Sequence, residues 1–93
     1  MGKLGEMKQK ADELKASLDH LMVSEEGASG DIKITMTGNR KVVSLSIAPA
    51  LQHGDREELE EQLIVTLNRA VDKADRLNEE EMKKAAGGLF PGL

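Results

Sequence analysis

The chain has 93 residues, of which 39% are hydrophobic, and it carries a formal net charge of −4. A chain this short removes only about 60–65% of its unfolded surface from water, so it supports a single domain with a thin core. The absence of cysteine excludes a disulfide framework. The start of the chain contains no continuous apolar segment, so we expect a cytoplasmic protein without a signal peptide or membrane span.

The acidic excess is confined to the last part of the chain. Residues 55–93 hold ten acidic and six basic residues, whereas residues 1–54 hold seven of each. Half of those ten acids stand at the start of a predicted helix, where the helix dipole favours negative charge. They are Asp55, Glu57, Glu58, Glu60 and Glu61. The rest of the chain is close to neutral and therefore permits a local basic surface.

Residues 1–22 have the apolar spacing of a coiled-coil helix. The 3-4-3-4-3 pattern forms a narrow seam, which predicts a helix that packs against another helix. The seam consists of Leu4, Met7, Ala11, Leu14, Leu18 and Leu21.

Residues 23–49 predict strands. Ile32, Ile34 and Met36 alternate with polar residues, and the same alternation returns at Val43, Leu45 and Ile47, which we expect to face inward. Between the two runs, Gly38-Asn39 supplies residues that tolerate positive φ in a hairpin turn. Pro49 ends the return strand. Residues 23–26 form a possible short first strand, followed by the turn-rich run 27–30.

Residues 55–86 predict a second, long helix. Asp55 can cap its start, with Glu58 three residues further on. We expect Gly87-Gly88 to end this helix. Its length of about 45 Å exceeds that of the core, so we expect the helix to form an arm that lies along the first helix. The tail, residues 87–93, is apolar and broken by Pro91-Gly92. The sequence leaves open whether it is mobile or lies in a dimer groove.

The inventory of chemical groups argues against an enzyme. The chain has two histidines, no cysteine, no tyrosine and no glycine-rich phosphate loop. His20 and His53 are interpreted as surface residues, since metal ligands normally come in convergent groups of three or four. We therefore expect no cofactor, no metal and no small-molecule substrate.

The basic residues are the candidate site. Arg69, Lys73 and Arg76 follow an i, i+4, i+7 spacing along one side of the long helix. Lys8 and Lys15 lie one heptad apart on the first helix, and Arg40 and Lys41 follow the hairpin turn. Such residues are more often solvated charges than phosphate contacts, but a two-fold axis would double each patch. Phe90 is the sole aromatic residue and lies in the tail, which disfavours recognition of single strands.

The order of these features resembles the YbaB/EbfC family of bacterial nucleoid-associated proteins. The resemblance covers nearly the whole chain, including Thr35-Met36-Thr37-Gly38, Ser46-Ile47-Ala48-Pro49 and the long second helix entering through Leu59-Glu60. It implies an α+β fold with α-β-β(-β)-α order, one domain over residues 1–93, and a homodimer with tweezers-like helical arms. It also implies binding to double-stranded DNA, altered DNA conformation, nucleoid organisation and gene regulation.

Some positions depart from the family pattern. Val43 and Ser44 stand where family members carry basic residues, and Ala48 replaces the usual acid before the proline. We therefore expect phosphate contacts to shift toward the helical arms and the turn residues Arg40 and Lys41. The alternative is a protein-interaction scaffold without DNA binding, in which the heptad seam and the apolar tail capture a partner.

Overall fold

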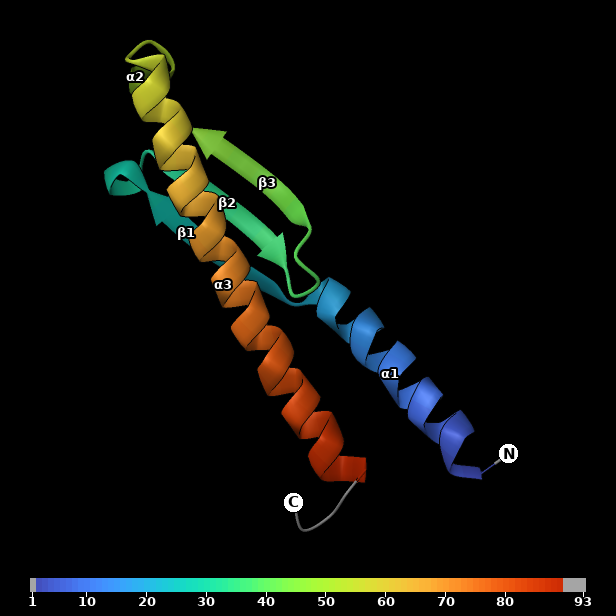
Figure 1. The fold of residues 1–93 in the computed structure, drawn as a ribbon. Coiled ribbons are helices and arrows are strands. Elements are labelled where there is room, and N and C mark those ends of the chain that lie inside the picture. The colour runs from blue at the N-terminus through green and yellow to red at the C-terminus, as the bar shows by residue number, and fades with distance from the viewer. Residues whose placement is uncertain (1, 90–93) are drawn as a thin grey trace.

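The computed structural model describes residues 2–89 (Figure 1). The elements are α1 (Gly2–His20), β1 (Met22–Gly27), the 3-10 turn η1 (Ala28–Gly30), β2 (Ile32–Thr37), β3 (Val42–Ile47), α2 (Pro49–Gln52) and α3 (Arg56–Leu89). The predicted α+β class and element order are confirmed, and the short first strand is present. The chain is elongated, with principal extents of 59 × 21 × 16 Å.

The core lies between the sheet and the first half of α3. The three strands are antiparallel in the order β1-β2-β3, and α3 crosses one face of the sheet (Figure 1). Ile32, Ile34 and Met36 of the central strand are buried against Ala70 and Ala74 of α3. Alanine at these positions lets the helix approach the strands closely, and the opposite face of the sheet is polar.

A glycine sets the distance between α3 and β1. A Cβ atom at Gly27 would lie 1.8 Å from Oγ1 of Thr66. Thr66 cannot move aside, because it is fully buried and its hydroxyl donates to the carbonyl of Gln62 at 2.7 Å. The helix therefore packs directly on the backbone of this strand.

The hairpin turn differs from the prediction. Of the turn residues, Arg40 has a positive φ of 65°, and Gly38 and Asn39 do not. The turn is closed by the Arg40 amide donating to the Thr37 carbonyl at 3.0 Å, the arrangement of a three-residue loop with a left-handed third residue. Gly38 is needed for space instead, since a Cβ there would lie 2.7 Å from Cδ2 of Leu18.

The return strand is more exposed than its alternation suggests. Leu45 pairs with Ile34 and so lies on the side of the sheet that α3 covers, yet 52% of it is exposed. Val43 is 54% exposed, at a bulge where Val42 rather than Val43 opposes Met36. The inward prediction was wrong for the burial of Val43 and Leu45, because β3 is an edge strand that α3 leaves partly uncovered. Ile47 is half-buried opposite Ile32.

Beyond the sheet, α1 and α3 form two antiparallel arms (Figure 1). Among the residues of the predicted α1 seam whose burial the structure describes, burial is greatest at the end next to the sheet. Leu18 is buried, Leu14 is half-buried and Met7 is exposed. The arms therefore pack together next to the sheet and separate toward their tips.

The helix boundaries differ slightly from the prediction. α1 ends at His20 rather than near residue 22, because β1 already begins at Met22. The cap at Asp55 is confirmed, with its Oδ1 accepting from the Glu57 amide at 2.9 Å. α3 continues through Gly87-Gly88 to Leu89, since extending a long helix adds a hydrogen bond per residue and offsets the cost of glycine, about 1 kcal/mol each. The rest of the predicted tail, residues 90–93, lies outside the described residues.

The connection after the sheet contains one turn of helix that the sequence did not predict. Pro49 occupies the first helical position of α2, where its fixed φ is favourable and its missing N–H is not needed. The strand still ends before the proline, as expected.

Candidate nucleic-acid interface

The basic stripe on α3 follows the β1 side of the sheet. Arg69 and Arg76 are exposed, and Lys73 between them is half-buried. Lys73 Nζ donates to the Ser24 carbonyl at 2.8 Å and lies 3.2 Å from Oε2 of Glu25. Its ammonium group therefore anchors α3 to β1 as well as adding charge to the stripe.

Glu25 is the group whose ionisation the stripe perturbs. The hydrogen bond from Lys73 holds the pKa of the Glu25 carboxyl below its ordinary value, although partial burial opposes this shift. The amide of Glu26 and the positive charges of Lys73 and Arg69 lower the pKa further. Glu25 is therefore ionised at neutral pH and offsets part of the positive charge of the stripe.

The hairpin turn is tied to both arms. Asn39 Nδ2 donates to the Lys15 carbonyl of α1 at 2.8 Å and to Oδ1 of Asp19 at 2.6 Å. On the other side, Arg40 forms an ion pair with Asp75 of α3. The turn therefore sits at the root of the arms and limits how they move relative to each other.

These bonds bring together basic residues that are distant in sequence. Lys15 lies beside the turn that carries Arg40 and Lys41, and Lys8 follows on α1 two helical turns further out. We call these four residues the junction group, and Arg69, Lys73 and Arg76 the α3 stripe. The Arg40–Asp75 ion pair connects the junction group to the same turn of α3 that carries Arg76.

The seven predicted residues differ in whether an acidic side chain of the protein already pairs with them. Arg40 and Lys73 are engaged by Asp75 and Glu25. Within residues 2–89, no ion pair involves the other five, which are Lys8, Lys15, Lys41, Arg69 and Arg76. All five are exposed.

Sequence reasoning missed an apolar surface beside the site. A hollow of about 280 Å³ opens between β3 and α3. It is lined by Ile34, Val42, Leu45, Leu63, Ile64 and Leu67. Four of them, Val42, Leu45, Ile64 and Leu67, are at least 40% exposed, and we call these four the β3 patch. The signal in the sequence was the run Leu63-Ile64-Val65, which makes the apolar surface of the long helix wider than a single narrow stripe.

The described residues offer no metal site. No group of three or more His, Asp or Glu side chains in residues 2–89 could hold an ion. Over the same range, no helix is both long enough and apolar enough to cross a membrane.

Comparison with known proteins shows the family of this chain. The family model described as the YbaB/EbfC DNA-binding family matches residues 1–89. The chain belongs to this family. It is 46% identical to a nucleoid-associated protein of Flavobacterium johnsoniae, over all of this chain and 87% of that protein. It is 37% identical to a nucleoid-associated protein of a Psychrobacter species, over 88% of this chain and 76% of the relative.

A solved structure supports the architecture independently. An uncharacterized protein of Helicobacter pylori superposes with a TM-score of 0.71, covering 94% of this chain and 98% of that one. The two sequences are only 22% identical, so this likeness concerns the fold alone.

Proposed function

We propose that this member of the YbaB/EbfC family is a nucleoid-associated protein that binds double-stranded DNA as a homodimer, in the cytoplasm and without catalysing a reaction. It reads few bases, alters the conformation of the DNA, and contributes to nucleoid organisation and gene regulation. The observation that carries the proposal is a set of five exposed basic side chains that take part in no ion pair within residues 2–89, in a chain of this family. They lie along α1, beside the hairpin turn and along α3.

The β3 edge is the surface on which a homodimer would form. β3 is the outer strand of the sheet, and the β3 patch beside it is apolar and half-exposed. An open, uncharged edge strand readily pairs with another strand. Two copies joined edge to edge would continue the sheet across a two-fold axis and cover the β3 patches of both.

The dimer also explains how an acidic chain can hold DNA. A two-fold axis would present two α3 stripes and two junction groups, while the acidic start of α3, residues 55–61, lies at the opposite end of that helix from the arm tips. Contacts from Arg69, Arg76 and Lys41 would neutralise phosphates and release counterions. Lys73 and Arg40 would contribute less, because a phosphate must compete with Glu25 and Asp75.

Little base specificity follows from the side chains available. The proposed contacts are lysines and arginines on exposed surfaces, which bind phosphates regardless of sequence. The chain has no tyrosine or tryptophan to stack on bases, and Phe90 lies outside the described residues.

The direct test is fluorescence anisotropy of a mixed-sequence DNA duplex titrated with the protein across a salt series. The logarithm of affinity should fall linearly with the logarithm of salt concentration, by about 0.9 for each phosphate neutralised. R69E/R76E should weaken binding at least roughly tenfold on every duplex and flatten this slope. A control with the same charge change, R56E/K83E, alters exposed arginine and lysine outside both basic groups and should have a much smaller effect. Equal affinity of wild type and R69E/R76E would remove the α3 stripe from the proposal.

A protein-interaction scaffold remains the second candidate, favoured by the exposed apolar surface of the β3 patch. It predicts a complex with another cytosolic protein that is insensitive to salt and depends on residues 85–93. Absence of DNA binding at low salt together with such a complex would favour the scaffold.

A further inference from the structure

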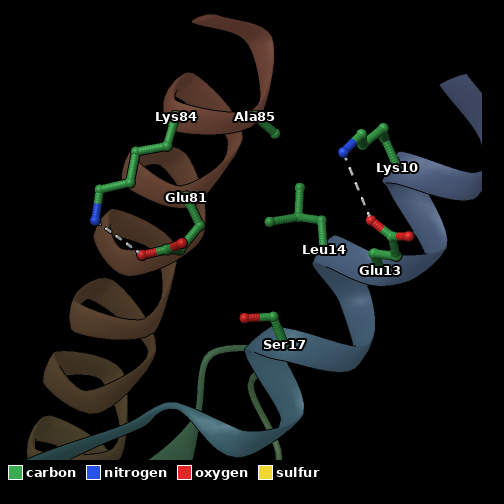
Figure 2. A pocket seen from close by; sticks show the side chains of 7 residues that line it. All are labelled: Lys10, Glu13, Leu14, Ser17, Glu81, Lys84 and Ala85. Carbon is green, nitrogen blue, oxygen red and sulfur yellow. Dashed lines mark hydrogen bonds and ion pairs between the residues drawn. The ribbon is translucent and has the colours of Figure 1, made fainter. Parts of the chain in front are cut away.

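A second apolar surface lies between the arms, away from the sheet. Its floor consists of Met7, Ala11, Leu14, Met82, Ala85 and Ala86, which line a hollow of about 220 Å³. A neighbouring hollow of about 370 Å³ shares Leu14 and Ala85 and is bounded by charged residues (Figure 2). We call the combined surface the arm groove. Met7 and Met82 are 44% and 53% exposed, so the arms do not cover each other.

The charges along the arm groove are arranged in two bands. On α1, Lys10 lies 3.9 Å from Glu13, and on α3, Lys84 lies 3.2 Å from Glu81. α1 runs toward the sheet and α3 runs away from it, so both lysines lie nearer the arm tips and both glutamates nearer the sheet (Figure 2). The two lysines of one chain therefore lie at the same level along the groove, as do the two glutamates, with Lys10 directed toward α3 and Lys84 directed away from α1 (Figure 2).

This arrangement offers no ion pair between the arms of one chain and selects the kind of partner. Lysine level with lysine and glutamate level with glutamate give no electrostatic attraction that would close the arms on each other. Two lysines and two glutamates sum to zero charge, so the groove offers no net attraction to DNA. A second arm pair whose tips point the opposite way reverses the bands, and each lysine then meets a glutamate.

We infer that the arm groove binds the arm groove of a second copy of this chain, with the tips pointing in opposite directions. The apolar floors then face each other and the four helices form a bundle, the arrangement in which amphipathic helices bury a shared core. The contact is isologous, since the same surface is used by both copies. It buries Met7 and Met82, which are the large exposed side chains of the floor.

This contact goes beyond the proposed function because it is separate from the β3 edge. A chain with one isologous contact at β3 and another at the arms assembles into an open row of alternating contacts rather than a closed dimer. Such a row would hold several DNA-binding surfaces together and could bridge separate DNA segments.

The test measures assembly without DNA by analytical ultracentrifugation over a concentration series. K10E/K84E makes the rim of the groove entirely acidic, and E13K/E81K makes it entirely basic. Each variant alone should lose species larger than the dimer, with self-association weakened at least roughly tenfold by like-charge contacts. An equimolar mixture of the two should restore the larger species. Lys83→Glu, a neighbouring exposed residue that does not line the groove, should assemble like wild type.

Three outcomes would overturn the inference. One is a wild-type chain that never exceeds a dimer, and another is a pair of charge variants, helical by circular dichroism, that fail to recover on mixing. The third concerns the protein at high dilution, where copies do not associate. If removing residues 90–93 then shifts the NMR methyl resonances of Met7 and Met82, the groove binds the tail of its own chain. Leu45→Lys separates the two contacts: it should abolish the β3 dimer and leave pairing through the arms intact.

Discussion

The two edges of the sheet are built from opposite chemistry. At the β1 edge, α3 lies against Gly27, and Lys73 binds the Ser24 carbonyl and the Glu25 carboxylate. At the β3 edge, the side chains of the β3 patch are apolar and half-exposed. Among the described residues, a side chain reaches the β3 backbone only at its end, where Gln52 donates to the Ile47 carbonyl at 2.7 Å.

This difference indicates which edge strand is covered by its own chain and which is suited to pairing with a second copy. A lysine that occupies a backbone carbonyl of an edge strand, as Lys73 of α3 does at Ser24, opposes pairing with another strand, whereas an uncharged edge promotes it. β1 is therefore completed by its own helix. β3 is suited to a second copy, and the four predictions below test this division.

The largest effect is expected where α3 touches β1. Gly27→Ala places a methyl group against the buried Thr66 side chain and should lower the free energy of unfolding by about 3 kcal/mol, as overpacking does in cores. Urea denaturation measures this change. Gly87→Ala, where nothing lies within 4 Å, should instead stabilise the protein by up to about 1 kcal/mol. A Gly27→Ala protein as stable as wild type would show that α3 does not depend on this close approach.

At the β3 edge the effect should fall on assembly. Leu45→Lys places a charge in the centre of the β3 patch and should weaken the proposed dimer by about 100-fold or more, because a buried unpaired charge is costly. Ser24→Lys, on the open face of β1 at the other edge of the sheet, is the matched control and should remain a dimer. Sedimentation equilibrium distinguishes them. Equal dissociation of both variants would mean that the patch is not the contact.

At the β1 edge a smaller loss is expected. Lys73→Met removes the bond to the Ser24 carbonyl and leaves Glu25 without its ammonium partner, which should cost about 1 kcal/mol of stability. Lys83→Met, an exposed position on the arm, should leave the unfolding free energy unchanged within about 0.5 kcal/mol. Thermal unfolding of the two variants shows whether Lys73 stabilises the packing of α3 on β1 or only adds positive charge to the α3 stripe.

The smallest expected effect is on how the free energy of unfolding depends on pH. Because the pKa of Glu25 is lowered in the folded protein, chiefly by Lys73, the unfolded chain takes up this proton first as the pH falls. The stabilisation is complete above the unfolded glutamate pKa of about 4.3 and is lost as the pH falls through the folded value. Glu25→Gln should therefore be less stable than wild type at pH 7, by less than about 1 kcal/mol, and equal to it in strong acid. A difference that stays constant with pH would contradict the Lys73–Glu25 interaction.

Much of the fold follows from local patterns. The alternation of Ile32, Ile34 and Met36 identified the central strand, and the cap at Asp55 located the start of α3. The turn was only partly predictable: a glycine and an asparagine marked its place, but the positive φ falls on Arg40, the third residue of a three-residue loop, and Gly38 packs against Leu18. Alternation also assigned Leu45 to the correct face of the sheet, but it revealed neither the bulge at Val43 nor the exposure of this edge.

The candidate site was predictable as a set of residues and not as an arrangement. The spacing of Arg69, Lys73 and Arg76 placed them on one side of a helix, which their positions on α3 bear out. That Lys73 would be engaged by Glu25, and Arg40 by Asp75, required contacts between residues far apart in the chain. The placement of Lys15 beside the turn depended in the same way on Asn39.

The sequence by itself determined the order of the elements, the faces of the helices and strands, and the family, because periodicity and turn residues act over a few neighbouring positions. The tertiary structure decided which of the described basic residues take part in ion pairs and which sheet edge its own helix leaves partly uncovered. It also decided at which level along the two arms their charges lie. These properties depend on which residues from distant segments become neighbours. Packing α3 across β1 and β2, and antiparallel to α1, settled that for this chain.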